Sequence, residues 1–453
     1  MNRHTPSICI LGPLCAWLLL AAVQGCLPFT SPRVELPDLS TYPQNASVYA
    51  RQTPDWTADP KERERRKHSF VQKYFRPWHS DQPIHSRAKL FWPLHAVGRQ
   101  QYFAENTRPR SRQWLDALRD KADPEAFPSE SQCGIALTNT DLRALPTRKP
   151  AFHDFQHAGQ GYPFDTFQNS ALWAGTPVHI VHATKSRDWL LVETDWIFGW
   201  VPGRDIGLVD ADFIEAFQST DLIAFVQDQT AVIDEQGVFR FTGHIGGLLP
   251  LVHHQNRSAE VLVPVTGTDR QAHLRTALLK PGVWTDFPMP VTGRNLARVA
   301  DALLGQTYGW GGLYENRDCS ALTRDLYTPF AIWLPRNSAQ QAQVPRTISL
   351  DHLRAREKER RILEQGLPFL TLISMPGHIM IYIGALNNRP LVMHAMWGLK
   401  TWSPFHGEGR YVVGQSVITS LSPGQGLPAP LQPRIALIER VQGMSVLVPG
   451  VND

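Results

Sequence analysis

Cysteine is scarce in this chain, and so is net charge. Of the 453 residues five are cysteines, and the 45 Lys and Arg residues nearly balance the 41 Asp and Glu residues. A net charge of +4 gives no case for nucleic-acid binding, which needs a concentrated basic surface. Hydrophobic residues make up 42% and charged residues 19%, so the chain is globular rather than disordered. Its length exceeds what one core organises, and about two to four domains are expected.

The apolar run from Ile8 to Val23 follows Arg3 and His4. It is too short for a membrane span and suits a secretory signal. The run ends in V-Q-G-C at residues 23–26, which resembles the lipobox of bacterial lipoproteins. That resemblance implies cleavage before Cys26, lipidation of its thiol and anchoring to a membrane. Because leucine and not aspartate follows, it also implies an exported, periplasmic protein held at the outer membrane. The alternative is an ordinary signal peptide with an incidental cysteine.

Export would leave only two cysteines without an assigned role. Cys9 and Cys15 would leave with the signal, so Cys133 and Cys319 remain. A disulfide between these two is one possibility, since exported proteins use them. Otherwise a free thiol in an oxidising compartment is a liability unless the protein uses it.

Residues 27–130 are predicted to form a linker and a docking region. Up to about residue 60 the chain is rich in proline and polar residues, which is typical of a linker. The charge run KERERRK at 61–67 predicts a solvated helix face, the alternative being a binding patch. The aromatic and histidine clusters at 75–79 and 85–95 raise a metal site as an alternative, but their spacing matches no standard ligand pattern. We therefore expect this region to pack on the other domains, with no metal or other cofactor.

Two stretches of short apolar segments bounded by glycine and proline predict two small β domains. Residues 131–208 carry G-T-P-V at 175–178, W-L-L-V at 189–192 and F-G-W-V-P at 198–202. This order resembles bacterial SH3-like barrels. Residues 209–287 again give short strands, and we interpret them as a second barrel of the same kind.

The last region, residues 288–453, begins with a helical pattern at 295–305. The stretch YGWGGLYENRDCSALTRDLY at 308–327 follows. Asp318 is a preferred N-cap residue, which places Cys319 in the first turn of a helix. There the helix dipole favours the thiolate. The apolar stripe at 322, 326 and 330 leaves Cys319 on another face, unlike a structural cysteine.

Two histidines are predicted to face each other in a hairpin. The segments PGHIMIYIG at 376–384 and PLVMHA at 390–395 are typical of two strands joined by five residues. A hairpin symmetric about residue 387 places His394 opposite Met380 and diagonal to His378, at roughly 7 Å or less. A cysteine nucleophile needs a base and a group that orients it, and His378 and His394 supply both. The alternative is two unrelated strand histidines.

Four blocks then occur in order: Y-x-W-G-G before D-C-S, L-P-R-x-S-x-x-Q, G-H-I-x-I-Y-I-G, and an apolar pair before H-A. Over residues 290–420 this set resembles the NlpC-type cell-wall peptidases, which are papain-like cysteine peptidases. The resemblance implies a multidomain chain in which an irregular or helical N-terminal region and two all-β SH3-like barrels precede an α+β papain-like domain. It also implies roles for individual residues. Catalytic roles fall on Cys319 as nucleophile, His378 as base and His394 as the third member. Substrate-binding roles fall on Tyr308, Trp310, Asp318, Ser320 and Ser338, with Asp165 and Trp196 from the first barrel as further candidates.

Relatives with SH3-like domains ahead of the catalytic domain cut peptidoglycan stem peptides between γ-linked D-glutamate and the diamino acid. In some, the first barrel closes the site so that only a free N-terminal L-alanine fits, and Asp318 could hold that ammonium. Three departures from the family pattern are visible: Ala321 and Met380 stand where glycine is usual, and about 40 residues separate Ser338 from His378. The alternatives are a non-catalytic wall-binding lipoprotein, and acyl transfer or amidase action at a papain-like site.

Overall fold

The computed structural model describes residues 34–53, 60–96, 100–218, 221–267, 269–344, 346–404 and 407–447. By contacts the chain divides into two units, residues 1–35 and 36–453. The predicted signal segment 1–26 and the lipidation site Cys26 lie outside the described residues. In the part that the structure describes, no helix is long and apolar enough to cross a membrane.

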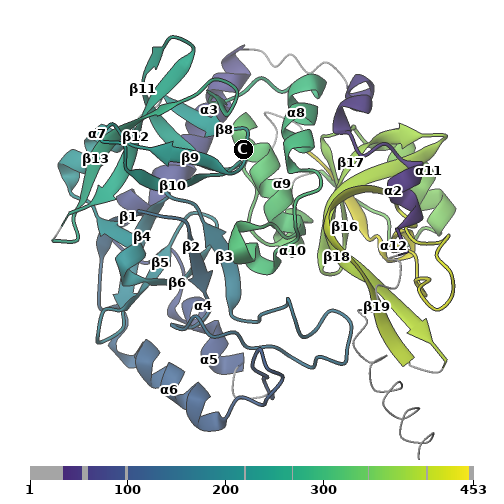
Figure 1. Ribbon diagram of the computed structural model, residues 1–453, viewed down its shortest axis with the longest axis horizontal. Helices are drawn as coiled ribbons and strands as arrows, with labels where there is room; N and C mark the ends of the chain where they lie inside the picture. Colours follow the sequence, from purple (N-terminus) through teal and green to yellow (C-terminus); the bar gives the residue numbers. More distant parts are fainter. Residues whose placement is uncertain are drawn as a thin grey trace, which may run out of the picture. The chain divides into compact units, whose positions relative to one another are not determined.

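Short helices and turns form the first part of the larger unit (Figure 1). They are α2 (Pro37–Thr41), η2 (Ala46–Val48), η3 (Ala50–Gln52), α3 (Pro60–Phe75), η4 (Arg76–His79), α4 (Arg87–Leu90), α5 (Trp92–Ala96), α6 (Arg112–Ala122) and η5 (Pro124–Ala126).

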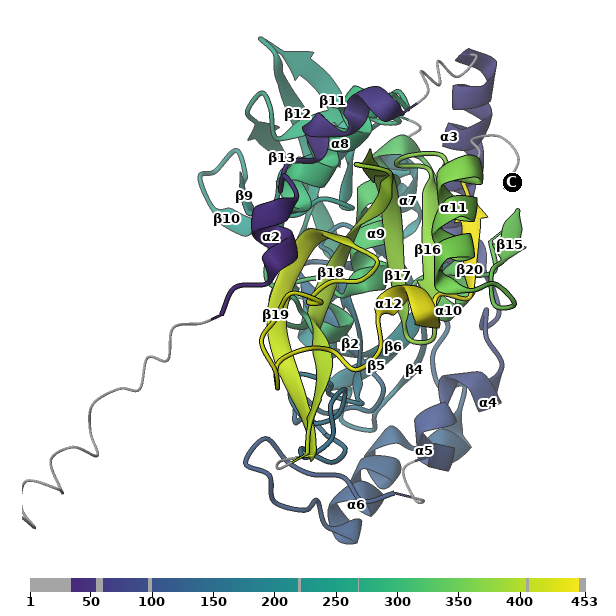
Figure 2. The ribbon, with the colours of Figure 1, turned by 90° about the vertical axis from the view of Figure 1, so that its right-hand side faces the viewer.

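The proline-rich stretch before residue 54 is not an extended linker, which corrects the expectation from composition. Asp38 is buried and accepts hydrogen bonds from the backbone N–H and hydroxyl of Ser420. Gln44 exchanges two hydrogen bonds of 2.8 Å with the backbone of Ile418. Because proline and serine are common in caps and turns as well as in linkers, composition alone did not separate the two. Figure 2 shows α2 beside the strand β19 (Gly407–Ser420).

The charge run at 61–67 lies in α3, but the helix face is only partly solvated. Glu62 and Arg66 are buried, and Arg66 Nη1 donates to the carbonyl of Phe330 at 2.7 Å. The aromatic cluster of α3 and η4 packs on both barrels, and Trp78 Nε1 donates to the carbonyl of Gly134 at 2.7 Å. Among the described residues no group of His, Cys, Asp and Glu side chains is arranged to hold a metal ion.

The first barrel is an antiparallel sheet with the strand order β3-β2-β6-β5-β4-β1-β7. Its elements are β1 (Gln132–Ala136), β2 (Thr140–Arg143), β3 (Gln168–Leu172), β4 (Pro177–Ala183), β5 (Trp189–Glu193), β6 (Phe198–Pro202), η6 (Gly203–Asp205) and β7 (Ile206–Leu208). Val178, Ile180, Leu190, Val192 and Val201 fill its core. A long loop at 144–167 joins β2 to β3 and reaches the last domain.

The second barrel begins with a helix and holds a two-stranded and a five-stranded sheet, β10-β9 and β13-β12-β11-β8-β14. Its elements are α7 (Ala211–Phe217), β8 (Leu222–Phe225), β9 (Thr230–Ile233), β10 (Phe239–Gly243), β11 (Leu248–Gln255), β12 (Ser258–Thr266), β13 (Ala272–Leu279) and β14 (Trp284–Asp286). The short apolar runs expected as strands in this region are strands.

The last domain packs helices on both faces of a six-stranded sheet of order β15-β20-β16-β17-β18-β19. Its elements are α8 (Gly293–Leu303), η7 (Trp310–Glu315), α9 (Cys319–Tyr327), η8 (Thr328–Phe330), α10 (Ser338–Gln341), β15 (Thr347–Ser349), α11 (Ala355–Gln365), β16 (Thr371–Met375), β17 (His378–Leu386), β18 (Arg389–Ser403), β19 (Gly407–Ser420), α12 (Leu437–Arg440) and β20 (Gly443–Val446). The predicted fold class, two SH3-like β domains followed by an α+β domain, is confirmed.

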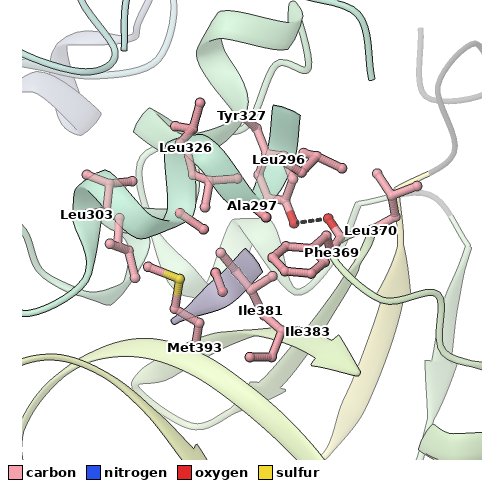
Figure 3. Packing of buried hydrophobic residues seen from close by; sticks show 14 of the residues in the cluster. Leu296, Ala297, Leu303, Leu326, Tyr327, Phe369, Leu370, Ile381, Ile383 and Met393 are labelled. Carbon is pink, nitrogen blue, oxygen red and sulfur yellow. Dashed lines mark hydrogen bonds between the residues drawn. The ribbon is translucent and has the colours of Figure 1, made fainter. Parts of the chain in front are cut away.

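The two faces of the central strands enter two different cores. Ile379, Ile381 and Ile383 of β17 face α8 and α9, as Figure 3 shows for the last two, and Tyr327 donates a hydrogen bond of 2.8 Å to the carbonyl of Phe369 there. Met380 and Tyr382 face a second core with α11 and α12. Since both faces are buried, the sheet fixes its register strongly, and this register positions the site.

Candidate active site

The hairpin of β17 and β18, which carries His378 and His394, has the predicted register, but for a reason that the sequence did not show. Its turn is not five residues but two, Asn387 and Asn388, both with positive φ. Asparagine tolerates this conformation, which the two-residue hairpin turn requires. A bulge between Tyr382 and Gly384 then shifts the pairing by one residue, so Ile381 pairs with Met393. His394 therefore lies opposite Met380 and diagonal to His378.

The two histidines are hydrogen-bonded to each other. His378 is half-buried at the first position of β17, and His394 is fully buried in β18. His378 Nε2 and His394 Nδ1 are 2.8 Å apart. Burial lowers the pKa of His378 to about 4, with a further contribution from Arg440. Burial also holds the pKa of His394 well below its usual value. At neutral pH both rings are therefore uncharged.

Cys319 is the first residue of α9, where Asp318 is the N-cap and accepts a 2.8 Å hydrogen bond from the N–H of Ala321. Its thiol lies against the backbone N–H of Ile379, next to His378. The expectation that Cys319 lies off the apolar stripe of the helix is wrong. The side chain is 7% exposed and packs in the same core as Leu322 and Leu326. Cys319 and Leu322 are three residues apart and share one helix face, so the buried stripe of α9 begins one turn earlier than residue 322, at Cys319.

The thiol is not the preformed thiolate that the helix start predicts. Burial, and then the charge of Asp318, raise the pKa of Cys319 to about 12. The N–H groups of Ile379 and Ser320 act in the opposite direction but are outweighed. A buried neutral thiol next to a neutral imidazole can still react, provided that the base takes the proton as the sulfur attacks.

Asp318 and Ser320 belong to a buried network whose centre is Arg336. The guanidinium donates to both Asp318 oxygens, at 3.0 and 2.8 Å, and to Ser320 Oγ at 2.9 Å. Its Nε donates to Ser170 Oγ of the first barrel at 2.8 Å. Asp318 also accepts from Ser320 Oγ and from the N–H of Gly311. With five donors in all, the carboxylate has no acceptor position left for a substrate ammonium. Arg336 was overlooked although it stands in the L-P-R-x-S block.

A second buried arginine, on the other side of the N-cap, joins the site to the second barrel. Arg317 donates to both oxygens of Asp228, at 2.5 and 2.9 Å, and to Asp325 of α9 at 2.7 Å. The neighbouring His244 ring lies 2.7 Å from Glu315 Oε2. Although burial opposes the charged form, Asp228 and Glu315 raise the pKa of His244. No pattern in the sequence indicates these pairs, because their members come from different domains.

Aromatic side chains from two domains form a cluster around Trp397. Tyr308 is buried, and its ring centre is 5.9 Å from that of Trp397. Phe164 of the first barrel lies 5.1 Å from Trp310 and 6.3 Å from Trp397, and Tyr162 lies 6.1 Å from Trp397. Burial keeps the pKa of Tyr308 well above its usual value, so the phenol remains a hydrogen-bond donor.

The W-G-G motif lets the catalytic domain approach the first barrel. Gly311 has φ +60°, and a Cβ atom there would lie 2.6 Å from the carbonyl oxygen of Gln168. Gln168 Nε2 bridges the Gly311 carbonyl at 3.1 Å and Asp141 at 2.7 Å. Trp310 Nε1 donates to the backbone carbonyl of Asp165 at 3.1 Å. The barrel therefore forms one wall of the site.

Three predicted residues lie away from the reacting groups or are otherwise engaged. The Asp165 carboxylate is buried and pairs with Arg143 at 2.7 Å, so it serves the barrel itself. Trp196 lies under the guanidinium of Arg324, 4.0 Å from the ring centre, towards the C-terminal half of α9. Ser338 begins α10 and is half-buried.

Cys133 and Cys319 are both free, so the alternative of a disulfide is wrong.

A hollow of about 370 Å³ opens between the barrel and η7, lined in part by Asp141, Tyr162 and Tyr314. Asp141 accepts one hydrogen bond, from Gln168, among the described residues. On a neighbouring side, the barrel loop contacts the β18–β19 hairpin: the N–H of Ala158 donates to Glu408 at 2.7 Å, and Arg410 donates to the carbonyl of Phe155 at 2.8 Å. The first barrel is thus joined to the last domain on this side as well.

The fold and this site define a chain in which two SH3-like barrels precede an α+β domain with a Cys-His-His arrangement. Comparison with known families agrees. A model described as the N-terminal NLPC_P60 stabilising domain matches residues 13–127, and an SH3 domain of the SH3b1 type matches 150–202. An SH3 domain of the SH3b2 type matches 210–255, and the NlpC/P60 family matches 305–402. The chain thus contains an NlpC/P60 domain, a domain type of cysteine peptidases, preceded by an N-terminal stabilising domain and two SH3-type domains.

A solved structure of similar fold gives the same result. An NlpC/P60 endopeptidase from Photobacterium damselae subsp. piscicida is 26% identical, with a TM-score of 0.81 over 90% of this chain and 98% of that one. An NlpC/P60 family protein from Bacillus cereus ATCC 10987 is more distant, 17% identical with a TM-score of 0.47 over 70% of this chain and all of that one. No curated protein matched the sequence.

Proposed function

We propose that this protein is a cysteine endopeptidase that hydrolyses peptidoglycan stem peptides between γ-linked D-glutamate and the diamino acid. One observation carries the proposal. The thiol of Cys319 lies against the N–H of Ile379, and the adjacent His378 is bonded through Nε2 to His394. That bond leaves Nδ1 of His378 for the reaction. The NlpC/P60 domain and the SH3-type domains support a cell-wall substrate.

The reaction begins from neutral groups. His378 Nδ1 accepts the thiol proton while the sulfur attacks the amide carbonyl, because neither group ionises by itself at neutral pH. The imidazolium then gives the proton to the leaving amine, and water attacks the thioester with His378 again as base. The backbone N–H of Cys319 and the hydroxyl of Tyr308 are the donors that we assign to the oxyanion.

We further propose a preference for stems with a free N-terminal L-alanine. Asp318 cannot hold the ammonium, because Arg336 and its other donors occupy both oxygens. Asp141 is the better candidate, since it accepts a single hydrogen bond among the described residues and lines the hollow beside η7. It is joined through Gln168 to Gly311, whose N–H donates to Asp318 next to the nucleophile.

Export and lipid anchoring of residue 26 belong to the same proposal and rest on the V-Q-G-C motif alone. Growth with labelled palmitate, with Cys26→Ser as the control, tests it. Label in the wild-type chain and none in the variant supports a periplasmic lipoprotein. Equal labelling contradicts it.

The enzymatic proposal is tested with residues 27–453 and two synthetic stem peptides, one with a free N-terminal L-alanine and one acetylated. Mass spectrometry should show cleavage after γ-D-glutamate in the free peptide only. Cys319→Ala should abolish cleavage and leave the fold intact, whereas Cys133→Ala, the matched change at the other free cysteine, should keep activity. Turnover by Cys319→Ala would refute the assignment. A new conjugate in place of two fragments would indicate acyl transfer.

A further inference from the structure

The second nitrogen of His394 is held by a residue that the proposed mechanism has not used. Thr419 lies in β19, the strand next to β18, and is fully buried. Its Oγ1 lies 3.1 Å from His394 Nε2. The same hydroxyl donates to the carbonyl oxygen of Ser420 at 2.8 Å. Thr419 therefore stands between an imidazole and a carbonyl.

This arrangement determines which ring nitrogen carries the hydrogen in His394 and in His378. A hydroxyl has one hydrogen and a carbonyl can only accept, so Thr419 gives its hydrogen to Ser420 and must accept from His394 Nε2–H. A neutral imidazole carries one N–H, so Nδ1 of His394 is an acceptor. The bond of 2.8 Å then requires His378 to donate from Nε2. Nδ1 of His378 is left with its lone pair.

We propose that Thr419 is a positioning residue that selects the tautomer of His378 able to take the thiol proton, an inference that rests on the proposed peptidase function. The opposite tautomer of His394 would carry hydrogen on Nδ1 and make His378 an acceptor at Nε2. His378 would then hold its hydrogen on Nδ1 and could not take another there. When the correct tautomer accepts the thiol proton, the Nε2–H stays on His378, and its bond to His394 stabilises the imidazolium.

The N-terminal region supports this selection. The carbonyl that receives the hydrogen of Thr419 belongs to Ser420, whose N–H and hydroxyl both donate to Asp38 Oδ2, at 2.9 and 2.8 Å. Asp38 also accepts from the N–H of Gly424 at 3.3 Å. Residue 420 is thereby fixed by a carboxylate from α2, 382 positions earlier in the chain.

The test compares Thr419→Val, which keeps the shape and removes the hydroxyl, with Thr419→Ser, which keeps the hydroxyl. We expect kcat of Thr419→Val to fall roughly tenfold at an unchanged KM, as loss of one buried hydrogen bond of this kind implies. Thr419→Ser should recover most of that loss. Thr371→Val removes another fully buried hydroxyl from the same sheet and serves as the control for stability.

Nitrogen NMR of the imidazoles in the Cys319→Ala background reads the tautomers without any substrate. Hydrogen on Nε2 of His378 is expected with Thr419 in place and in Thr419→Ser, together with a mixture of tautomers in Thr419→Val. An unchanged tautomer in Thr419→Val, or an equal loss in Thr371→Val, overturns the inference. If the tautomers respond as expected but the wild-type enzyme cleaves no stem peptide, the proposed function fails and the role of Thr419 in fixing the tautomer stands.

Discussion

Replacing Arg336 with glutamine should be among the most damaging single changes in the catalytic domain. The guanidinium is 3% exposed and makes four hydrogen bonds, three of them to Asp318 and Ser320 beside the nucleophile. Glutamine cannot span these partners and leaves the Asp318 carboxylate buried without its counter-charge. Removing one partner of a buried ion pair costs about 3–5 kcal/mol, which is a large part of the stability of an ordinary domain.

The assay is urea unfolding at pH 7 of four proteins: the wild type, Arg336→Gln, Asp318→Asn and the double variant. Asparagine keeps a good N-cap at residue 318, so the cycle isolates the charge pair. The double variant should recover at least about 2 kcal/mol of the summed losses, since no unpaired charge remains. Arg148→Gln is the control, because Arg148 is 62% exposed in its side chain and lies 3.9 Å from Asp205. It should cost less than about 1 kcal/mol.

The pair also predicts a pH dependence. Although burial opposes ionisation, Arg336 lowers the pKa of Asp318 below its ordinary value. The stability that the Arg336–Asp318 pair contributes is therefore full above the pKa of about 3.9 that Asp318 has in the unfolded chain. It is lost as pH falls through the pKa of Asp318 in the folded protein. A coupling energy below about 0.5 kcal/mol at pH 7, or one that persists unchanged in acid, would refute the reasoning.

Three further changes test other parts of the structure. His244→Gln should remove a pH-dependent part of the stability. Asp228 and Glu315 raise the pKa of His244 against its burial, so this part is full below about pH 6.5 and is lost as pH rises. The urea midpoint of the variant should therefore vary less than that of the wild type between about pH 6 and 8. Tyr327→Phe leaves the Phe369 carbonyl without its 2.8 Å bond and should cost about 1–2 kcal/mol in the same assay. Asp38→Ala should cost about 2 kcal/mol by loss of charged hydrogen bonds, and an unchanged midpoint would contradict docking of the N-terminal region.

Local patterns in the sequence were sufficient for much of this structure. The segments at 376–384 and 390–395 predicted the two strands of the hairpin, and Asp318 before an apolar stripe predicted the start of α9. Both depend on residues a few positions apart, where helix and strand periods apply directly. The register of the two histidines was predicted as observed although the expected turn was wrong, since the bulge beside Gly384 offsets the shorter turn.

What the sequence did not reveal depends on contacts between distant segments. Asp318 was expected to be free for substrate, but Arg336 and the first barrel enclose it. The thiol of Cys319 was expected to be acidic because of the helix start, yet burial by the sheet and the charge of Asp318 prevail. A helix end lowers a thiol pKa only where the site stays polar. Whether it does is decided by the domains that pack around it.

The two buried arginines beside the nucleophile limit how this protein can change in evolution. Arg317 needs Asp228 from one barrel, and Arg336 contacts Ser170 of the other. Modular proteins often gain new specificities by exchanging whole domains, because most interfaces between domains are small and polar. Here a new barrel that lacked Asp228 would leave the buried guanidinium of Arg317, directly before the N-cap, with Asp325 as its remaining carboxylate partner among the described residues. Exchange is therefore restricted to barrels that bring the matching acid or hydroxyl, and the three domains must diverge as one unit.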